Sequence, residues 1–211
     1  LPAAIRLSRI RCAAPPPGSP VVRSSSSANA NHPSASISFA KPAGTAQGDL
    51  LLAIVSHQSG SSSNMTPPSG WTAVPNGDYS DANNARIHSW YKFAGASEPS
   101  SYAFTMAGSS QAIAGGMLAI TGASGTPINA ALGQVTAANT LFLTAPSITT
   151  TAPKTLLVYG GAMFLNMMWP RAATNPRPAT EAPALDFHWG WLNSKPVLWT
   201  VLGVIVVVGA V

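Results

Sequence analysis

Short hydrophobic runs separated by turn-forming residues make up the middle of the chain. The stretches Arg86–Phe93 and Ser101–Met106 alternate between apolar and polar residues. A period of two residues is typical of β-strands that bury one face. Clusters of Pro, Asn and Gly, such as Pro67–Gly70 and Asn76–Asp78, lie between the runs and indicate turns. The pattern therefore predicts about eight short strands and no amphipathic helix.

The run Asp49–Val55 (DLLLAIV) differs from these, because apolar residues occupy its successive positions. A strand that is apolar on both faces is expected at the centre of a sheet, covered on each side. The predicted core contains either Leu51, Ala53 and Val55 or the alternate set Leu50, Leu52 and Ile54, together with Tyr102, Phe104, Leu156 and Val158. A Gly115-Gly116 pair inside Ala112–Thr121 indicates a β-bulge or a close approach of another backbone.

These elements predict an all-β fold, an antiparallel β-sandwich that is jelly-roll-like and carries irregular N- and C-terminal tails. Residues 1–33 have the Pro- and Ser-rich composition of a disordered linker. Residues 34–163 are predicted to form the sandwich domain. Residues 164–211 are predicted to be an irregular tail that ends in an apolar segment.

That apolar segment, Val197–Val211, contains 15 apolar or neutral residues without interruption. It is shorter than a standard membrane-spanning helix, which needs about 20 residues. Three interpretations compete: a truncated membrane anchor, a long buried strand, and a translation artefact that follows a frame change near Trp169. The abrupt change in composition favours truncation or artefact, so residues beyond about 165 are expected to pack little against the sandwich.

The net charge of +5 is unevenly distributed along the chain. Four arginines precede residue 34, whereas residues 34–163 contain equal numbers of acidic and basic side chains. A nucleic-acid interface needs clustered Lys and Arg on a folded surface, so nucleic acid is not expected as a partner. Cys12 is the single cysteine, which excludes an intrachain disulfide and a thiolate metal site.

Candidate catalytic residues are few. His57, His88 and Asp49 would be needed for a Ser-His-Asp site, but the chain has no Gly-x-Ser-x-Gly motif to present a nucleophile. Asp78, Asp81 and Asn83 lie in one loop and carry oxygen ligands that suit Ca²⁺, although a solvated turn is the simpler interpretation. The sequence thus predicts no enzyme activity, no cofactor and no metal site.

Two tryptophans are the candidate ligand-binding residues. Trp71 and Trp90 would form a flat platform for sugar rings if their faces are exposed, since indole combines an apolar face with an N–H donor. The alternative is that Trp71 closes one end of the sandwich and Trp90 belongs to the core. Large aromatic side chains in small sandwiches are usually buried, which favours the core interpretation.

Four segments resemble a known kind of module: PAGTAQGDLLLA (Pro42–Ala53), PPSGWTAV (Pro67–Val74), YKFAGASEPSSYAFTM (Tyr91–Met106) and AITGASGTPI (Ala119–Ile128). In order and spacing they are similar to a β-sandwich module that recurs in tailed-phage virion proteins and in bacterial secreted or surface proteins. The resemblance covers the predicted domain and implies no catalytic set.

The resemblance implies a structural or display module on a virion or at the extracellular cell surface. Its expected partners are other virion or surface proteins, including further copies of the same chain. A carbohydrate-binding or adhesive module, with glycans as partners, is the alternative. A membrane partner is expected only if Val197–Val211 is a truncated anchor.

Overall fold

The described part of the chain consists of β-strands joined by turns, without helices. The computed structural model describes residues 18–58, 64–81, 85–107, 111–136, 145–152, 154–165 and 199–210. The strands in these residues are β1 (Val21–Ser34), β2 (Ser36–Ala40), β3 (Leu50–Gln58), β4 (Asn64–Thr66), β5 (Thr72–Ala73), β6 (Tyr79–Ser80), β7 (Ala85–Phe93), β8 (Ser101–Ala107), β9 (Gln111–Thr121), β10 (Ala123–Thr136), β11 (Thr155–Leu165) and β12 (Trp199–Ala210).

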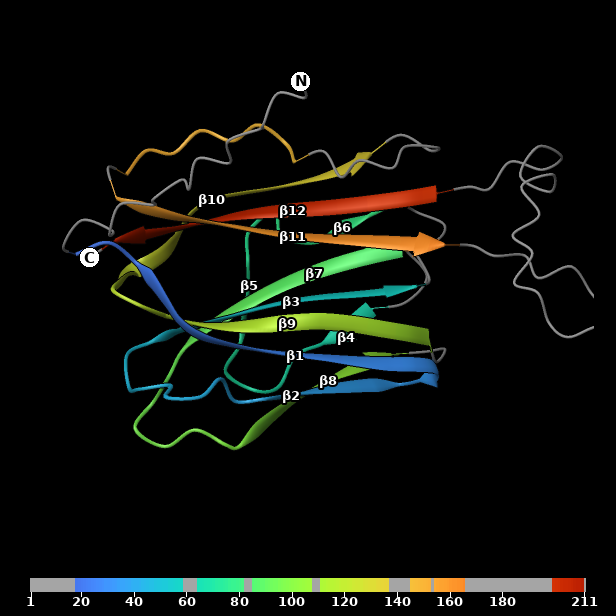
Figure 1. Ribbon diagram of the computed structural model, residues 1–211, viewed down its shortest axis with the longest axis horizontal. Coiled ribbons are helices and arrows are strands. Elements are labelled where there is room, and N and C mark those ends of the chain that lie inside the picture. Colours follow the sequence, from blue (N-terminus) through green and yellow to red (C-terminus); the bar gives the residue numbers. More distant parts are fainter. Residues whose placement is uncertain are drawn as a thin grey trace, which may run out of the picture.

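The strands form three stacked antiparallel sheets (Figure 1). The middle sheet has the order β1-β9-β3-β7-β5, and β6 also pairs with β7. The lower sheet, as drawn in Figure 1, has the order β2-β8-β4, and the upper sheet has the order β10-β12-β11. The predicted antiparallel all-β sandwich is therefore confirmed, and the structure adds a third sheet to it.

Two separate hydrophobic cores lie between the sheets. The lower core, between the middle and lower sheets, contains Ile37, Phe39, Leu51, Ala53, Val55, Met65, Trp90, Ala94, Tyr102, Phe104, Met106, Ile113, Met117 and Ala119. The upper core, between the middle and upper sheets, contains Leu50, Leu52, Val74, Ala85, Ile87, Ile120, Ala123, Val206 and Val208.

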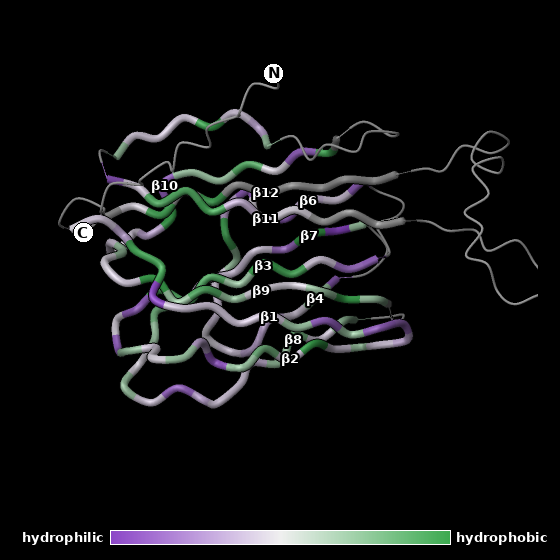
Figure 2. The backbone as a smooth tube through the Cα atoms, viewed as in Figure 1, coloured by the Kyte–Doolittle hydropathy of each residue, from purple (hydrophilic) through white to green (hydrophobic). Residues whose placement is uncertain are grey.

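Strand β3 is the centre of this arrangement, as its sequence predicts. Its odd-numbered apolar residues enter the lower core with Tyr102 and Phe104, and its even-numbered residues enter the upper core, against which Leu156 and Val158 pack. The set Leu51, Ala53 and Val55 is thus buried in the lower core, and Leu50 and Leu52 are buried in the upper core. The other predicted core residues of the upper side, Ile54, Leu156 and Val158, are partly buried against it. Figure 2 shows the hydrophobic colouring along β3 and a much paler tube along the serine-rich β1.

Glycine at position 115 lets two layers approach each other. A Cβ atom there would lie 2.5 Å from the carbonyl oxygen of Ile54 and 3.0 Å from the Phe39 ring. A Cβ at Gly116 would meet only ordinary contacts, the nearest being the Ser26 carbonyl oxygen at 3.5 Å. The close approach predicted for this glycine pair is therefore confirmed, and it belongs to Gly115.

The prediction of a linker up to residue 33 is wrong from Val21 onward, because Val21–Ser34 forms β1 at the edge of the middle sheet. Its register with β9 runs from Val21 opposite Thr121 to Ser34 opposite Gln111. Ladder hydrogen bonds of the backbone hold this strand, so its small polar side chains carry no strong hydrophobic signal. The preceding residues 1–17, including Cys12, lie outside the described residues.

The prediction that the C-terminal segment packs little is also wrong. Strand β12 lies between β10 and β11 and pairs with both along most of its length. Val206 and Val208 are fully buried in the upper core, so the long-strand interpretation of this segment is the correct one. No helix in the described residues is long and apolar enough to cross a membrane. Residues 166–198 lie outside the described part of the chain.

Candidate functional site

The structure places both candidate tryptophans against the lower core. Trp90 is 6% exposed and stacks on His88, with 5.0 Å between the ring centroids. Trp71 is half-buried and meets the rings of Tyr102 and Phe104 edge-on. The ring of Trp90 is therefore not an exposed platform, and the core interpretation describes both residues.

Next to Trp90, polar side chains from four segments form a connected cluster. Arg86 and His88 lie on β7, His57 lies near the end of β3, Asn64 begins β4, and Asp78 precedes β6. The Arg86 guanidinium donates to both carboxylate oxygens of Asp78, at 2.8 and 2.7 Å, and to the Asn64 side-chain oxygen at 2.6 Å. We call these five residues the histidine cluster.

The two histidines extend the cluster towards the lower core. Nδ1 of His88 lies 3.3 Å from Oδ2 of Asp78, and Nε2 of His88 lies 3.1 Å from Nε2 of His57. Nδ1 of His57 in turn lies 3.3 Å from the carbonyl oxygen of Gln58. His57 is fully buried and His88 is 3% exposed. Ring nitrogens buried in this way are normally hydrogen-bonded.

The contacts of this pair limit where its hydrogen atoms lie. The Asp78 carboxylate is an acceptor, so Nδ1 of His88 donates to it. The two Nε2 atoms face each other, so one of them must carry a hydrogen atom and donate to the other.

The environment shifts the pKa values of two of these groups, His57 and Asp78. Burial lowers the pKa of His57 from its ordinary 6.5 to about 4, and the positive charges of His88 and Arg86 act in the same direction. Burial alone would raise the pKa of Asp78, but hydrogen bonds from His88 and Arg86 outweigh it and hold that pKa below the usual range. His57 is therefore neutral and Asp78 charged near neutral pH.

A cleft of about 430 Å³ opens beside the cluster, where β4 of the lower sheet faces β7 of the middle sheet. It is lined by Asn64, Met65, Thr66, Ala73, Asp78, Arg86, His88, Ser89 and Trp90. The Asp78 side chain is 48% exposed and reaches solvent, whereas the Arg86 side chain is 18% exposed. The cleft thus combines hydroxyl, amide and charged groups with the side chains of Met65, Ala73 and Trp90.

The residues considered for a Ser-His-Asp site do not assemble. His57 and His88 come together near the last residue of β3. Asp49 directly precedes the first residue of β3, at the other end of the strand, and pairs with Arg23 at 2.7 Å. The carboxylate that reaches His88 is that of Asp78, and the other ring nitrogen of His88 faces His57 rather than a hydroxyl group. The cluster therefore lacks a nucleophile at the position where a triad has one.

The loop considered for calcium is also committed to other contacts. Asp78 is bound by Arg86, and Asp81 accepts a hydrogen bond from the Ala85 backbone N–H at 2.8 Å. Asn83 lies outside the described residues. Among the described residues, no group of three or more His, Cys, Asp or Glu side chains is placed to hold a metal ion.

Sequence reasoning missed the contact between Asp78, Arg86 and His88. One signal was present: the alternation in Arg86–Phe93 assigns His88, Trp90 and Lys92 to one face of a strand. A histidine on the same face as a buried tryptophan needs a polar partner in the core, and Asp78 lies in the preceding loop. The pairing with His57 required the register of β3 and β7, in which Val55 opposes His88 and His57 opposes Arg86.

The fold and the site together define a class: an all-β module of three antiparallel sheets with a polar cleft at one edge. Comparisons of the chain with protein-family models, with curated proteins and with solved structures gave no match. The function proposed below therefore rests on the sequence pattern and on the geometry of this chain.

Proposed function

We propose that the protein is a non-catalytic structural or display module of a phage virion or of a bacterial cell surface. One observation carries the non-catalytic part: the ionisable groups of the histidine cluster are bound to one another. Asp78 is held by Arg86 and His88, and the remaining nitrogen of His88 is held by His57. A general base needs a ring nitrogen directed at a substrate or a nucleophile.

The architecture supports a structural role. Two hydrophobic cores stiffen a chain of ordinary domain length, and ion pairs such as Arg23–Asp49 and Lys92–Glu98 tie its loops to its strands. The resemblance of the segments Pro42–Ala53 and Tyr91–Met106 to virion and surface modules supports the location.

The location is tested on the native source. An antibody raised against the full chain is expected to label intact virions or intact cells, as seen by immunogold electron microscopy. Labelling that appears only after the cells are lysed contradicts the proposal. The non-catalytic part is tested with panels of ester, peptide and glycoside substrates, on which the protein should show no turnover above background. Turnover that His88→Ala abolishes would overturn it.

A second candidate, carbohydrate binding, is favoured by the cleft. Its volume suits a small ligand, and Asn64, Thr66 and Asp78 present acceptors and donors of the kind that bind sugar hydroxyl groups. The test is a glycan array followed by calorimetry on the glycan that binds best. Asn64→Ala should weaken that binding, and Asn29→Ala, an exposed position on β1, is the matched control. Equal binding by both variants would exclude the cleft as the site.

A further inference from the structure

The upper sheet covers only part of the middle sheet. Strands β10 and β12 lie over β6, β12 lies also over β7, and β11 lies over β3 and β7. Strands β9 and β1 continue the middle sheet beyond β3. Ile120, near one end of β9, is buried in the upper core, whereas Gly116 and Leu118 are only partly buried and Ala114 is exposed. The side chains of Ser25, Ser27 and Asn29, at alternate positions of β1, are also exposed.

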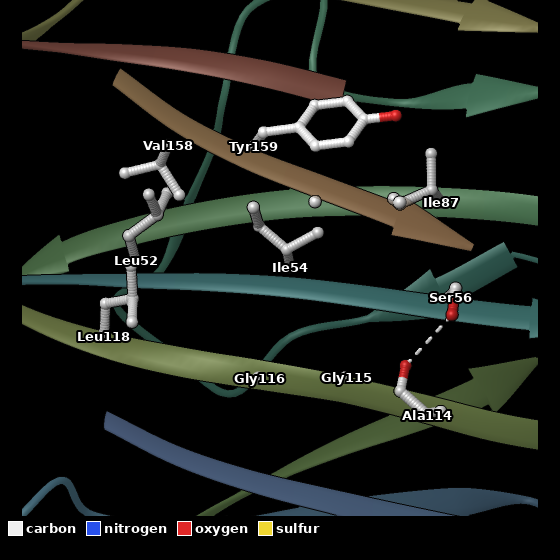
Figure 3. Close-up of a pocket in the computed structure, with 12 residues that line it drawn as sticks. Leu52, Ile54, Ser56, Ile87, Ala114, Gly115, Gly116, Leu118, Val158 and Tyr159 are labelled. Atoms are coloured by element: carbon white, nitrogen blue, oxygen red, sulfur yellow. Dashed lines mark hydrogen bonds between the residues drawn. The ribbon is translucent and has the colours of Figure 1, made fainter. Parts of the chain in front are cut away.

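A groove of about 290 Å³ follows the line where this cover ends (Figure 3). Leu52, Ile54, Gly116 and Leu118 of β3 and β9 line it from the middle sheet, and residues 158–161 of β11 form its wall. In Figure 3 the β11 ribbon crosses above Ile54, and Gly116 and Leu118 lie on the uncovered side. None of the residues that line the groove is charged.

The wall of the groove is a strand edge. In the described part of the chain β11 pairs with β12 and with no other strand, so the backbone N–H and C=O groups of its other edge lack ladder partners. Gly160 brings this edge close to the middle sheet, since a Cβ atom there would lie 2.8 Å from Cγ2 of Ile54. An open strand edge above an apolar strip is the arrangement to which an extended peptide adds as a further strand.

Strands β9 and β1, which project beyond the edge of the upper sheet, limit what can bind in the groove. Neighbouring strands lie about 4.8 Å apart and packed sheets about 10 Å apart, so a strand added beside β11 would lie over β9. If β11 of a second copy occupied that place by two-fold antiparallel pairing, the β9 and β1 strands of the two copies would collide beneath the joined sheets. A single extended segment has no such projecting layer.

We propose that this groove accepts one extended, uncharged polypeptide segment of a neighbouring protein, which pairs with the free edge of β11 and packs alternate apolar side chains on Ile54, Gly116 and Leu118. The upper sheet becomes four-stranded, and the cover over the middle sheet reaches β9. The inference goes beyond the proposed function, because it holds whatever assembly the module belongs to. Carbohydrate binding concerns the separate cleft beside β4.

The test uses the full chain and a synthetic probe. The probe is a blocked peptide of about eight residues in which valine and threonine alternate, which matches the length of a typical strand. Binding is measured by fluorescence anisotropy, and the bound site is located by amide hydrogen exchange. The expected result is saturable binding that slows exchange at amides of β11. The control is the same peptide with N-methyl groups on alternate backbone nitrogens, along the edge that would pair with β11. It should not bind, because methylation removes the N–H donors of that edge.

A matched pair of variants locates the site independently. Gly116→Lys places a charged chain in the groove, and its Cβ meets no contact closer than 3.5 Å, so the fold should be retained. Thr105→Lys places the same charge on the exposed outer face of β8. Circular dichroism confirms that both variants are folded. Gly116→Lys should weaken probe binding at least tenfold and Thr105→Lys should not change it. Absence of binding, equal binding by both variants, or exchange protection at another edge overturns the inference.

Discussion

The buried histidine pair makes the stability of the protein depend on pH in a calculable way. His57 is fully buried, and its pKa in the folded protein is about 4, compared with 6.5 for an ordinary histidine. As the pH falls below 6.5, the unfolded chain takes up a proton at this position and the folded chain does not. The free energy of unfolding is therefore undiminished above pH 6.5 and falls as the pH drops from 6.5 towards 4.

The size of the effect follows from the two pKa values. Each pH unit between them costs about 1.4 kcal/mol, so the shift lowers the free energy of unfolding by about 3 kcal/mol by pH 4. Burial is the main reason why the folded state resists protonation of His57. The Arg86 charge acts in the same direction. Its guanidinium binds the Asp78 carboxylate, which reaches His88, and His88 contacts His57.

The assay is urea unfolding followed by tryptophan fluorescence at pH 7.0, 5.5 and 4.5. His57→Gln removes the titrating group and should flatten this dependence, because glutamine can still hydrogen-bond His88. His32→Gln, at an exposed position of β1, is the control and should keep the dependence of the natural protein. If His57→Gln and the natural protein lose stability equally between pH 7.0 and 4.5, the lowered pKa of His57 is not the cause of the pH dependence.

Three further changes test the packing. Phe104→Ala should cost about 3–5 kcal/mol, because Phe104 is fully buried among aromatic rings, whereas Leu157→Ala, at a position that is 58% exposed, should cost less than about 0.5 kcal/mol in the same urea titration. Gly115→Ala should cost about 1–3 kcal/mol because its Cβ would press on the Ile54 backbone, and Gly116→Ala should be tolerated; thermal melts compare the pair. Deleting residues 199–211 should expose the upper core and produce binding of a hydrophobic dye, whereas a truncated protein that melts like the full chain would refute the role of β12.

The centre of the fold could be predicted because burial leaves a direct trace in composition. Asp49–Val55 is apolar at successive positions, and this pattern has few explanations other than a strand covered on both faces. Alternation in Ser101–Met106 placed Tyr102 and Phe104 in the core for the same reason. In these segments the hydrophobic effect alone specifies which way the side chains point.

Strand β1 could not be predicted because backbone hydrogen bonds stabilise it with little apolar burial. Its run of serines resembles a linker, yet its inner positions are small enough to sit at a sheet edge, and Ser24 and Ser26 donate to the carbonyl oxygens of Ala43 and Ala40. Such bonds join residues that are distant in sequence and have no local signature. The same holds for Asp78 and His88, whose contact depends on how the loop before β6 folds over β7.

The apolar run of β3 also bears on which segments of the chain belong to the domain. Residues 21–121 contain both the middle and the lower sheet, whereas the three strands of the upper sheet all come from residues 123–210. Leu50, Leu52, Ile87 and Ile120 face that upper sheet, so the first part of the chain alone would leave a large apolar surface in water. A run that is apolar on both faces therefore requires a third layer, and the valine-rich C-terminal segment belongs to the domain because it supplies the middle strand of that layer. The upper sheet covers β3 and β7 but only part of β9, where Ile120 is buried and Leu118 is partly buried. The same requirement therefore extends beyond the edge of β11, where we expect the proposed added strand to meet it.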